Sequence, residues 1–549
     1  MKDKKHKKLY LLALILLLLS CTGMEKSKKP GEAFYGTPWL ILELDRSRLL
    51  VSEVAKDLDE PWEIAWGPDD HLWLTEHKGA VKRINPATGK IKEVLSLPDV
   101  YFSRTPGLLG MVLHPDFNTD PYVYIHYTYI DSTIVEIDHR GRSSNIRSKI
   151  VRYRFLPDKE TLSDPETILP NIPGSGHHNG SRLVVSADNK LIFSLGDTGN
   201  REGIHKKKVL TGKVLRINLD GSVPDDNPVP GSYFYSMGHR NPQGLVDANG
   251  KIFISEHGPN NDDELNLITA GGDYGWPYVE GFCDKENELS YCDTTSVIEP
   301  LIAWTPTIAP AGLDFYDHPS IPEWQNSLLL TSLKGRSLQV LSLDDSGKQI
   351  ISKKIYLQKQ FGRYRDLCVS SSGDVYLITS NTDWHINRHP WMYENVPIDG
   401  NDRIIKLSPI ANGGDDYPEV TIIGEDSAQI RLFTQERINF EIPGTKLYVQ
   451  HCASCHLPSG KGIADFVPSI LDTEWVNDKN KLIETTLNGL TGEVKVKDRM
   501  YNAVMPGFAV SLNDQEIAEI LNYVKGTLNN HQDDVSAEEV AIIRNTISQ

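Results

Sequence analysis

The sequence predicts an all-β, six-bladed β-propeller followed by a small all-α domain. Two observations lead to this expectation. Between about residues 36 and 410 long helical patterns are scarce and one strand-turn-strand pattern recurs six times, whereas after about residue 430 the apolar residues take helical spacing. Strand pairs of this kind bury one face only by stacking on neighbours, so six units separated by irregular segments favour a closed propeller over a sandwich.

Each copy consists of an apolar strand, a polar turn and a second apolar strand. The copies lie at 64–76, 110–128, 182–197, 244–258, 312–332 and 365–380. In a closed propeller the loops between strands would carry the chemistry, over the central channel. We therefore expect the propeller over residues 36–412, a linker over 413–432, the helical domain over 433–530 and a polar tail over 531–549.

The N-terminus has the pattern of a bacterial export signal. Five lysines in the first eight residues precede an apolar run over 9–19, which is too short to span a bilayer comfortably. The run ends in Leu-Leu-Ser-Cys, which resembles the lipobox whose cysteine is acylated after cleavage. We expect a signal peptide over 1–21, a lipid on Cys21, a polar tether over 22–35, and an exported protein anchored on the periplasmic side of a bacterial membrane; a plain signal peptide or an uncleaved anchor is the alternative.

Charge and cysteine content narrow the partners and the compartment. The formal net charge is −17, which argues against nucleic acid as a partner and favours a basic redox partner. Cys283 and Cys292 flank a short polar stretch and could form a disulfide in an oxidising compartment. Cys368 lies in an apolar stretch, so we expect a buried free thiol there.

The segment HCASCH at 451–456 contains the CxxCH sequence that attaches haem c. In this motif Cys452 and Cys455 would form the two thioethers, and His456 would be the proximal iron ligand. A zinc site is the alternative, but it would need two further ligands, and this region offers only His531 far downstream. The sequence therefore predicts a covalent haem.

The segment at 505–525 resembles the closing part of small class I cytochromes c, a Met-Pro loop followed by a helix. The resemblance implies Met505 as the sixth iron ligand, with Met500 as the competing candidate. The helix is legible from Ile517, Ile520, Leu521 and Val524, which share one face.

Several propeller segments are similar, in order, to the soluble pyrroloquinoline-quinone (PQQ)-dependent glucose and aldose sugar dehydrogenases. They are 107–117, 212–228, 238–245, 255–281 and 363–367, and the similarity runs through almost all of 55–408. Each short motif alone is weak, but their shared order is specific. The resemblance implies oxidation of the C1 hydroxyl of an aldose to a lactone, with PQQ and calcium as cofactors.

PQQ is a planar tricarboxylate, so its site would need several fixed cations and a hard metal. The resemblance places Arg240, Asn241, Lys334, Arg363 and Arg365 at cofactor contacts. Alternate strand residues share a face, so the two arginines of the RYR sequence can point at one ligand. The alternative is that these basic residues are ordinary surface side chains, and for Lys334 taken alone that alternative is favoured.

The resemblance also implies a calcium ion held by the backbone carbonyls of Gly258 and Pro259, which are the hard oxygen ligands that calcium prefers. Four nearby acidic residues are candidates to support this ion or a second one, although acidic loops are more often only solvated. They are Asp262, Asp263, Glu264 and Asp273.

His178 is the expected catalytic base, since it lies in a loop that resembles the family's base-bearing loop, and neutral imidazole suits proton abstraction near pH 7. Arg240 would stabilise charge that develops on the quinone oxygen, together with calcium. In glucose-oxidising members an aspartate precedes the base, whereas this chain has His177. Thr105 and Pro106 also depart from the polar amide or acid that is common there, so the sugar is left open.

Together these features predict that electrons pass from PQQ to the fused haem and then to an external acceptor. Two other functions remain open at this point. A calcium-dependent, lactonase-like hydrolase would need carboxylate ligands to the metal and would not need the basic residues. A non-catalytic binding propeller attached to a cytochrome would need neither quinone nor sugar.

Overall fold

The computed structural model describes residues 37–547 apart from 135, 138–142, 202, 389–401, 411–420, 424–441, 453–455, 457–459, 461–466, 491, 498, 502–504, 506 and 510–511. The predicted signal peptide, lipid-bearing Cys21 and the whole tether, as well as Cys455 of the haem motif, lie outside the described residues. Within the part of the chain that the structure describes, no helix is long and apolar enough to cross a membrane.

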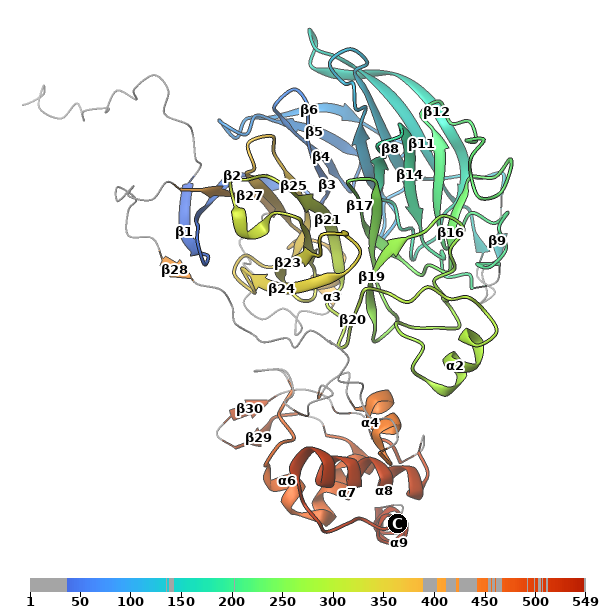
Figure 1. Ribbon diagram of the computed structural model, residues 1–549, viewed down its shortest axis with the longest axis vertical. Coiled ribbons are helices and arrows are strands. Elements are labelled where there is room, and N and C mark those ends of the chain that lie inside the picture. The colour runs from blue at the N-terminus through green and yellow to red at the C-terminus, as the bar shows by residue number, and fades with distance from the viewer. Residues whose placement is uncertain are drawn as a thin grey trace, which may run out of the picture. The chain divides into compact units, whose positions relative to one another are not determined.

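Six antiparallel sheets surround a common centre, which confirms the predicted propeller (Figure 1). The first three sheets are β3 (Pro61–Trp66), β4 (Leu72–Glu76), β5 (Ala80–Ile84) and β6 (Ile91–Ser96); β7 (Leu108–Leu113), β8 (Tyr122–Ile130), β11 (Ile146–Leu156) and β12 (Thr161–Pro173); and β13 (Leu183–Val185), β14 (Lys190–Leu195), β15 (Lys213–Asn218) and β16 (Phe234–Met237). A two-stranded ribbon, β9 (Glu136–Ile137) and β10 (Ser143–Ser144), lies between β8 and β11 in the sequence.

The other three sheets continue this order. They are β17 (Pro242–Ala248), β18 (Lys251–Glu256), β19 (Asp263–Ile268) and β20 (Ile302–Trp304); β21 (Pro310–Tyr316), β22 (Ser327–Ser332), β23 (Ser337–Leu343) and β24 (Ile350–Tyr356); and a last sheet that begins with β25 (Tyr364–Val369), β26 (Val375–Thr379) and β27 (Asp402–Pro409). The short helices α2 (Glu286–Cys292), η1 (Pro322–Trp324) and α3 (Trp384–Arg388) lie in loops.

The six sequence copies correspond to the first two strands of each sheet. The first strands, β3, β7, β13, β17, β21 and β25, contact one another in a closed ring. The second strands are almost wholly buried, as in β4 and β26, because each is covered by the adjacent sheets on both faces. This is why their sequences are apolar runs and not alternating patterns.

The N-terminal strand closes the ring. β2 (Arg48–Leu58) pairs antiparallel with β27, so a strand that precedes the first sheet in the sequence extends the last one. β1 (Thr37–Glu43) pairs with β2, and β28 (Thr421–Ile423) adds in parallel to β1. Residues 421–423 were expected in a linker and are instead a strand at the edge of this sheet.

The C-terminal part is helical, as predicted, with α4 (Thr445–His451), α6 (Glu474–Asn477), α7 (Lys479–Asn488), α8 (Asp514–Asn522), the π-helical segment η3 (Tyr523–Leu528) and α9 (Ala537–Ile547). Its core includes Tyr448, Ile483 and Ile517. It also contains a hairpin that an all-α domain does not have, β29 (Val494–Val496) with β30 (Arg499–Tyr501).

The prediction of a polar tail over 531–549 is wrong, because α9 packs on α8. Val535 and Val540 are buried in the domain core, and the Arg544 side chain contacts Asp514 at 2.7 Å. Within α9, Val540 is buried whereas Ile542 is 66% exposed, so its apolar residues do not all share one face that sequence analysis could detect.

Cys283 and Cys292 form the expected disulfide, with their Cα atoms 6.5 Å apart. Cys368 is a buried free cysteine, as expected, and burial raises the pKa of its thiol. It is therefore a core side chain without nucleophilic character.

Candidate active site

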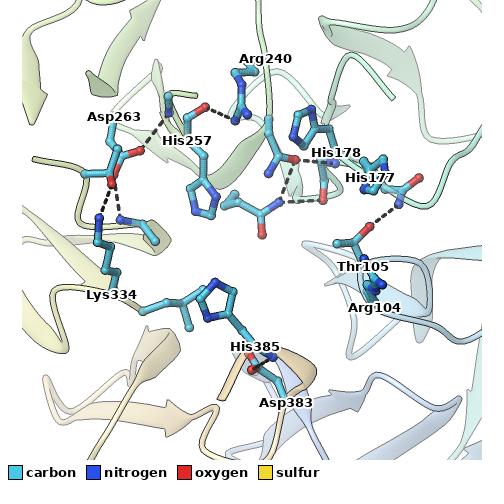
Figure 2. A pocket seen from close by; sticks show the side chains of 18 of the residues that line it. Arg104, Thr105, His177, His178, Arg240, His257, Asp263, Lys334, Asp383 and His385 are labelled. Atoms are coloured by element: carbon cyan, nitrogen blue, oxygen red, sulfur yellow. Dashed lines mark hydrogen bonds between the residues drawn. The ribbon is translucent and has the colours of Figure 1, made fainter. Parts of the chain in front are cut away.

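One cavity of about 560 Å³ gathers the residues predicted to bind PQQ and to act as the base. It lies where the loops between consecutive sheets, and those between second and third strands, emerge at the same end of the propeller. All eight predicted propeller site residues line it: His178, Arg240, Asn241, Gly258, Pro259, Lys334, Arg363 and Arg365. Figure 2 shows side chains from several sheets converging on it.

His178 is held by a buried carboxylate that the sequence analysis did not identify. Its Nδ1 lies 2.7 Å from Oδ1 of Asp197, whose side chain is only 2% exposed, whereas that of His178 is 25% exposed. Asp197 also accepts hydrogen bonds from the Gly199 amide at 2.7 Å and the Trp276 indole at 2.9 Å. With Nδ1 donating to Asp197, Nε2 of His178 is the atom that can accept a proton.

The backbone at His178 has φ +49°, a left-handed conformation that is uncommon outside glycine and is found at functional sites. Burial would raise the pKa of Asp197, but the hydrogen bonds from His178, Gly199 and Trp276 hold that pKa below its usual value. A signal for Asp197 was present, because the third sequence copy ends at this residue, two positions after the end of β14.

Arg240 is fixed at its backbone and exposes part of its guanidinium to the cavity. Its amide donates to Glu256 at 2.8 Å and its Nη1 donates to the His257 carbonyl at 2.9 Å. Its Nε is buried, and among the described residues no group accepts from it. Burial lowers the pKa of Arg240, which is the response of a cation held in a cavity wall without a full counter-charge.

Arg363 and Arg365 point to the same side, as the two-residue spacing predicted. Nη2 of Arg363 lies 2.9 Å from Asp383 and Nη2 of Arg365 lies 3.6 Å from the same carboxylate. Arg365 also lies over the ring of Trp62 at 4.2 Å and donates to Gln243 at 3.4 Å. Burial lowers the pKa of Arg365 to about 10. One carboxylate between two guanidiniums leaves a net positive charge on this wall.

The loop predicted to bind calcium is organised by Asp263. This carboxylate accepts backbone hydrogen bonds from Gly258 at 2.9 Å, Ile308 at 2.6 Å and Ala309 at 2.7 Å. A Cβ atom at position 258 would lie 1.9 Å from the Asn261 carbonyl oxygen, so the tight turn requires glycine. Lys334, on the facing loop, donates to Thr307 at 2.7 Å.

The other acidic residues near this loop also serve internal hydrogen bonds. Asp262 accepts from Thr305 at 2.6 Å, Glu264 from the Gly281 amide at 2.8 Å, and Asp273 contacts His205 at 2.9 Å. Among the described residues no group of three His, Cys, Asp or Glu side chains could hold a metal. The structure thus gives these carboxylates a role in shaping loops, and the carbonyl site for calcium stays a prediction.

In the C-terminal domain, Nδ1 of His456 lies 3.1 Å from the Pro468 carbonyl oxygen. This contact orients the ring and leaves Nε2 for a metal. Met505 forms two backbone hydrogen bonds with Leu490 and is partly buried. Met500 lies in β30 and is 57% exposed. This exposure favours Met505 over Met500 as the sixth ligand, and the ligand stays a prediction.

Comparison with known proteins identifies both parts of the chain. The glucose/sorbosone dehydrogenase family model matches residues 58–388, and the cytochrome c family model matches residues 442–527. The chain is 32% identical over 418 residues to quinoprotein glucose dehydrogenase B of Acinetobacter calcoaceticus, covering 61% of this chain and 86% of that protein. It is 42% identical over 88 residues to cytochrome c-552 of Thermus thermophilus, covering 15% of this chain and 64% of that protein.

Among solved structures, the PQQ-bound form of aldose sugar dehydrogenase from Streptomyces coelicolor superposes with a TM-score of 0.55 and 30% identity, covering 66% of this chain and 98% of that one. The family predicted from the order of the propeller motifs is therefore confirmed. The chain belongs to the glucose/sorbosone dehydrogenase family, and a cytochrome c domain follows its propeller.

Proposed function

We propose that the protein oxidises the C1 hydroxyl of an aldose sugar to a lactone with PQQ, and that electrons pass to its own haem c and then to an external acceptor. The observation that carries this proposal is the His178–Asp197 pair, held in one cavity with Arg240 and the guanidiniums of Arg363 and Arg365. The names of the relatives, a quinoprotein glucose dehydrogenase and a PQQ-bound aldose sugar dehydrogenase, support the same reading.

The residues of the cavity fit PQQ. The buried Nε atoms of Arg240 and Arg365 donate to no acceptor among the described residues, and the carboxylates of the quinone are suited to such donors. We assign Arg240, Asn241, Lys334, Arg363 and Arg365 as its contacts. When bound, PQQ would supply a two-electron oxidant that takes hydride from C1 and later yields electrons singly.

In the reaction, Nε2 of His178 takes the proton of the C1 hydroxyl while hydride leaves the same carbon. Asp197 fixes the imidazole tautomer and stabilises the positive charge that forms on the ring. Arg240 lies where it can donate to an oxygen that gains negative charge. The fold places these groups on loops of adjacent sheets, so their geometry depends on the closed ring.

We further assign calcium to the carbonyl oxygens of Gly258 and Pro259. The turn that presents them is held by Asp263, whose three backbone hydrogen bonds fix the loop on both sides. A loop fixed in this way can present carbonyl oxygens, which are ligands of the kind that calcium takes. No side-chain carboxylate is needed in this arrangement.

For electron transfer we assign Cys452 and Cys455 as the thioether links of haem c, His456 as the proximal ligand and Met505 as the sixth ligand. The contact of His456 with Pro468 supports this assignment. Export and a lipid on Cys21 would place the protein on the periplasmic side of a bacterial membrane, where a membrane-bound or soluble acceptor would collect the electrons.

The hydrolase alternative is less well supported. It requires carboxylates that ligate a metal in the cavity, but the two acids that line the cavity are already engaged. Asp263 accepts from three backbone amides, and Asp383 pairs with two arginines. Both acids act as structural partners of the cavity wall.

The test uses the oxidised full-length holo-cytochrome with calcium, with and without PQQ, and follows the haem α-band while aldoses are supplied. We expect haem reduction only when quinone and sugar are both present, and the H178N variant should lose it. If the haem can be reduced by dithionite but no sugar reduces it with quinone present, the dehydrogenase proposal is refuted and the hydrolase or binding-module functions gain support.

A further inference from the structure

The active-site cavity carries more basic groups than the proposed quinone contacts use. In addition to the four assigned cations, its wall includes Arg104, His177 and His385 (Figure 2). Its two carboxylates do not offset them, because Asp263 binds backbone amides and Asp383 lies between two arginines. Within the described residues, Arg104 forms no ion pair. A basic group is therefore available at the cavity wall for a ligand.

Arg104 is held on the same side of the cavity as the base. Its neighbour Thr105 donates from Oγ1 to the Gly176 carbonyl at 3.1 Å. The Asn179 side chain donates to the same Oγ1 at 3.1 Å. These two bonds fasten the Arg104 loop to both ends of the loop that carries His178, and Figure 2 shows Arg104 and Thr105 next to the two histidines.

Arg104 also lies over an aromatic ring. Its guanidinium carbon is 5.7 Å from the centre of the Trp384 ring, and both side chains are partly exposed and line the cavity. A tryptophan face offers an apolar surface for the C–H face of a sugar ring. A stacked guanidinium offers a planar fork that binds carboxylate or phosphate oxygens in pairs. The two together suit a sugar that carries an anion.

We propose that the preferred substrate is an anionic aldose, whose carboxylate or phosphate binds Arg104 while its C1 hydroxyl faces His178. This inference rests on the proposed function. The oxidation is unchanged: C1 loses hydride to PQQ and its hydroxyl loses a proton to His178, while the anionic group takes no part. A uronic acid and an aldose phosphate present the same chemistry to the guanidinium fork, and the experiment separates them.

The test measures kcat/KM of the PQQ- and calcium-loaded full-length protein for matched sugars: galactose with galacturonate, and glucose with glucuronate and with glucose 6-phosphate. The variants are Arg104→Gln, Arg104→Lys and, as a matched control, Arg154→Gln, which removes an exposed arginine that lies over the ring of Tyr122 at 6.0 Å. We expect the anionic sugar of a pair to be preferred, and R104Q to lower the anionic-to-neutral ratio about 10- to 100-fold, the size of a lost charged hydrogen bond. R104K should retain part of the preference for the anionic sugar, and R154Q should retain all of that preference.

A binding measurement gives a second readout that does not depend on turnover. Galactarate has no anomeric hydroxyl and cannot undergo this oxidation, so calorimetry can report its affinity for the loaded, oxidised protein. R104Q should weaken it about 10-fold or more, and added salt should narrow the gap between the two proteins. A preference for uronates alone identifies a carboxylate site, and a preference for the phosphate alone identifies a phosphate site.

Equal kcat/KM for neutral and anionic sugars, or an R104Q protein with an unchanged ratio and unchanged galactarate affinity, would overturn the inference and leave the sugar dehydrogenase proposal intact. Failure of every sugar, neutral or anionic, to reduce a competent haem would overturn the proposed function itself and this inference with it.

Discussion

The substitution Asp197→Asn tests the assignment of His178 as the base. In the native protein Asp197 accepts from Nδ1 of His178 at 2.7 Å, so the ring presents an unprotonated Nε2 to the cavity. An amide at position 197 is nearly the same size, but its NH₂ group can donate to Nδ1. That exchange would place the ring proton on Nε2, the atom that must accept the substrate proton.

General base catalysis contributes about 10²- to 10⁴-fold, so D197N should lower kcat by about that factor. The affinity for PQQ should be unchanged, because Asp197 does not line the cavity.

The free energy of unfolding should also change, with a definite sign. The pKa of Asp197 is depressed in the folded protein, so its contribution is present above its usual pKa and is lost as pH falls through the depressed value. D197N should therefore unfold more easily at pH 7, with the difference shrinking in acid.

The assay is steady-state oxidation of a good aldose by PQQ-loaded protein with an artificial acceptor, beside a titration of PQQ binding. The matched control is Asp374→Asn, which removes a carboxylate paired with Lys406 at 2.8 Å outside the cavity. The reasoning is refuted if D197N binds PQQ normally and keeps kcat within about threefold of the native value, since a base locked in the wrong tautomer cannot do so.

Three further predictions follow from other parts of the molecule. Methionine ligation raises the reduction potential of a c-type haem, so M505H should lower that potential in a redox titration. M500L, at an exposed position, should leave the potential unchanged. A potential lowered by M500L and unchanged by M505H would assign Met500 as the ligand. Arg182 contacts buried Glu63 and Asp366 at 2.5 and 2.7 Å, so R182A should lower the free energy of unfolding, measured in urea, by about 3–5 kcal/mol. The triple variant R182M/E63Q/D366N should recover most of this lost stability. A loss no larger in R182A than in the triple variant would contradict the pairing. Burial raises the pKa of Asp314 to about 7, so its stabilising neutral form is lost as pH rises through that value, and the unfolding free energy of the native protein minus that of D314N should fall by about 2–3 kcal/mol between pH 5 and pH 8; a constant difference would show that the carboxyl titrates normally.

Features that repeat along the chain could be predicted from the sequence. The six strand pairs were visible because their second strands are mostly apolar, and eight of the residues that line the cavity were visible because the motifs that carry them occur in a family order. The side-by-side placement of Arg363 and Arg365 followed from the period of a strand alone. Each of these features depends on a short local pattern or on a pattern that recurs, so it can be predicted without knowing which distant residues are in contact.

Contacts between distant loops could not be predicted. Asp197 and Trp276 are 79 residues apart and meet through a hydrogen bond to a side chain. Arg104, in the loop between the first and second sheets, meets Trp384 in a loop of the last sheet. Neither pair leaves a local pattern, because each contact joins loops of different sheets. Helix α9 was missed for a related reason, since the burial of Val540 and of the preceding Val535 depends on packing against distant helices.

The closed ring also explains why stability and the site are connected. Arg182 donates from Nε to the Gln243 carbonyl at 2.7 Å and pairs with acids of the first and last sheets. The side chain of Gln243 in turn accepts from Arg365 at the cavity wall. Arg182, a buried cation that joins three sheets, therefore also helps to set the position of Arg365, a proposed quinone contact. On this reasoning R182A should weaken PQQ binding as well as the fold, although Arg182 itself does not line the cavity.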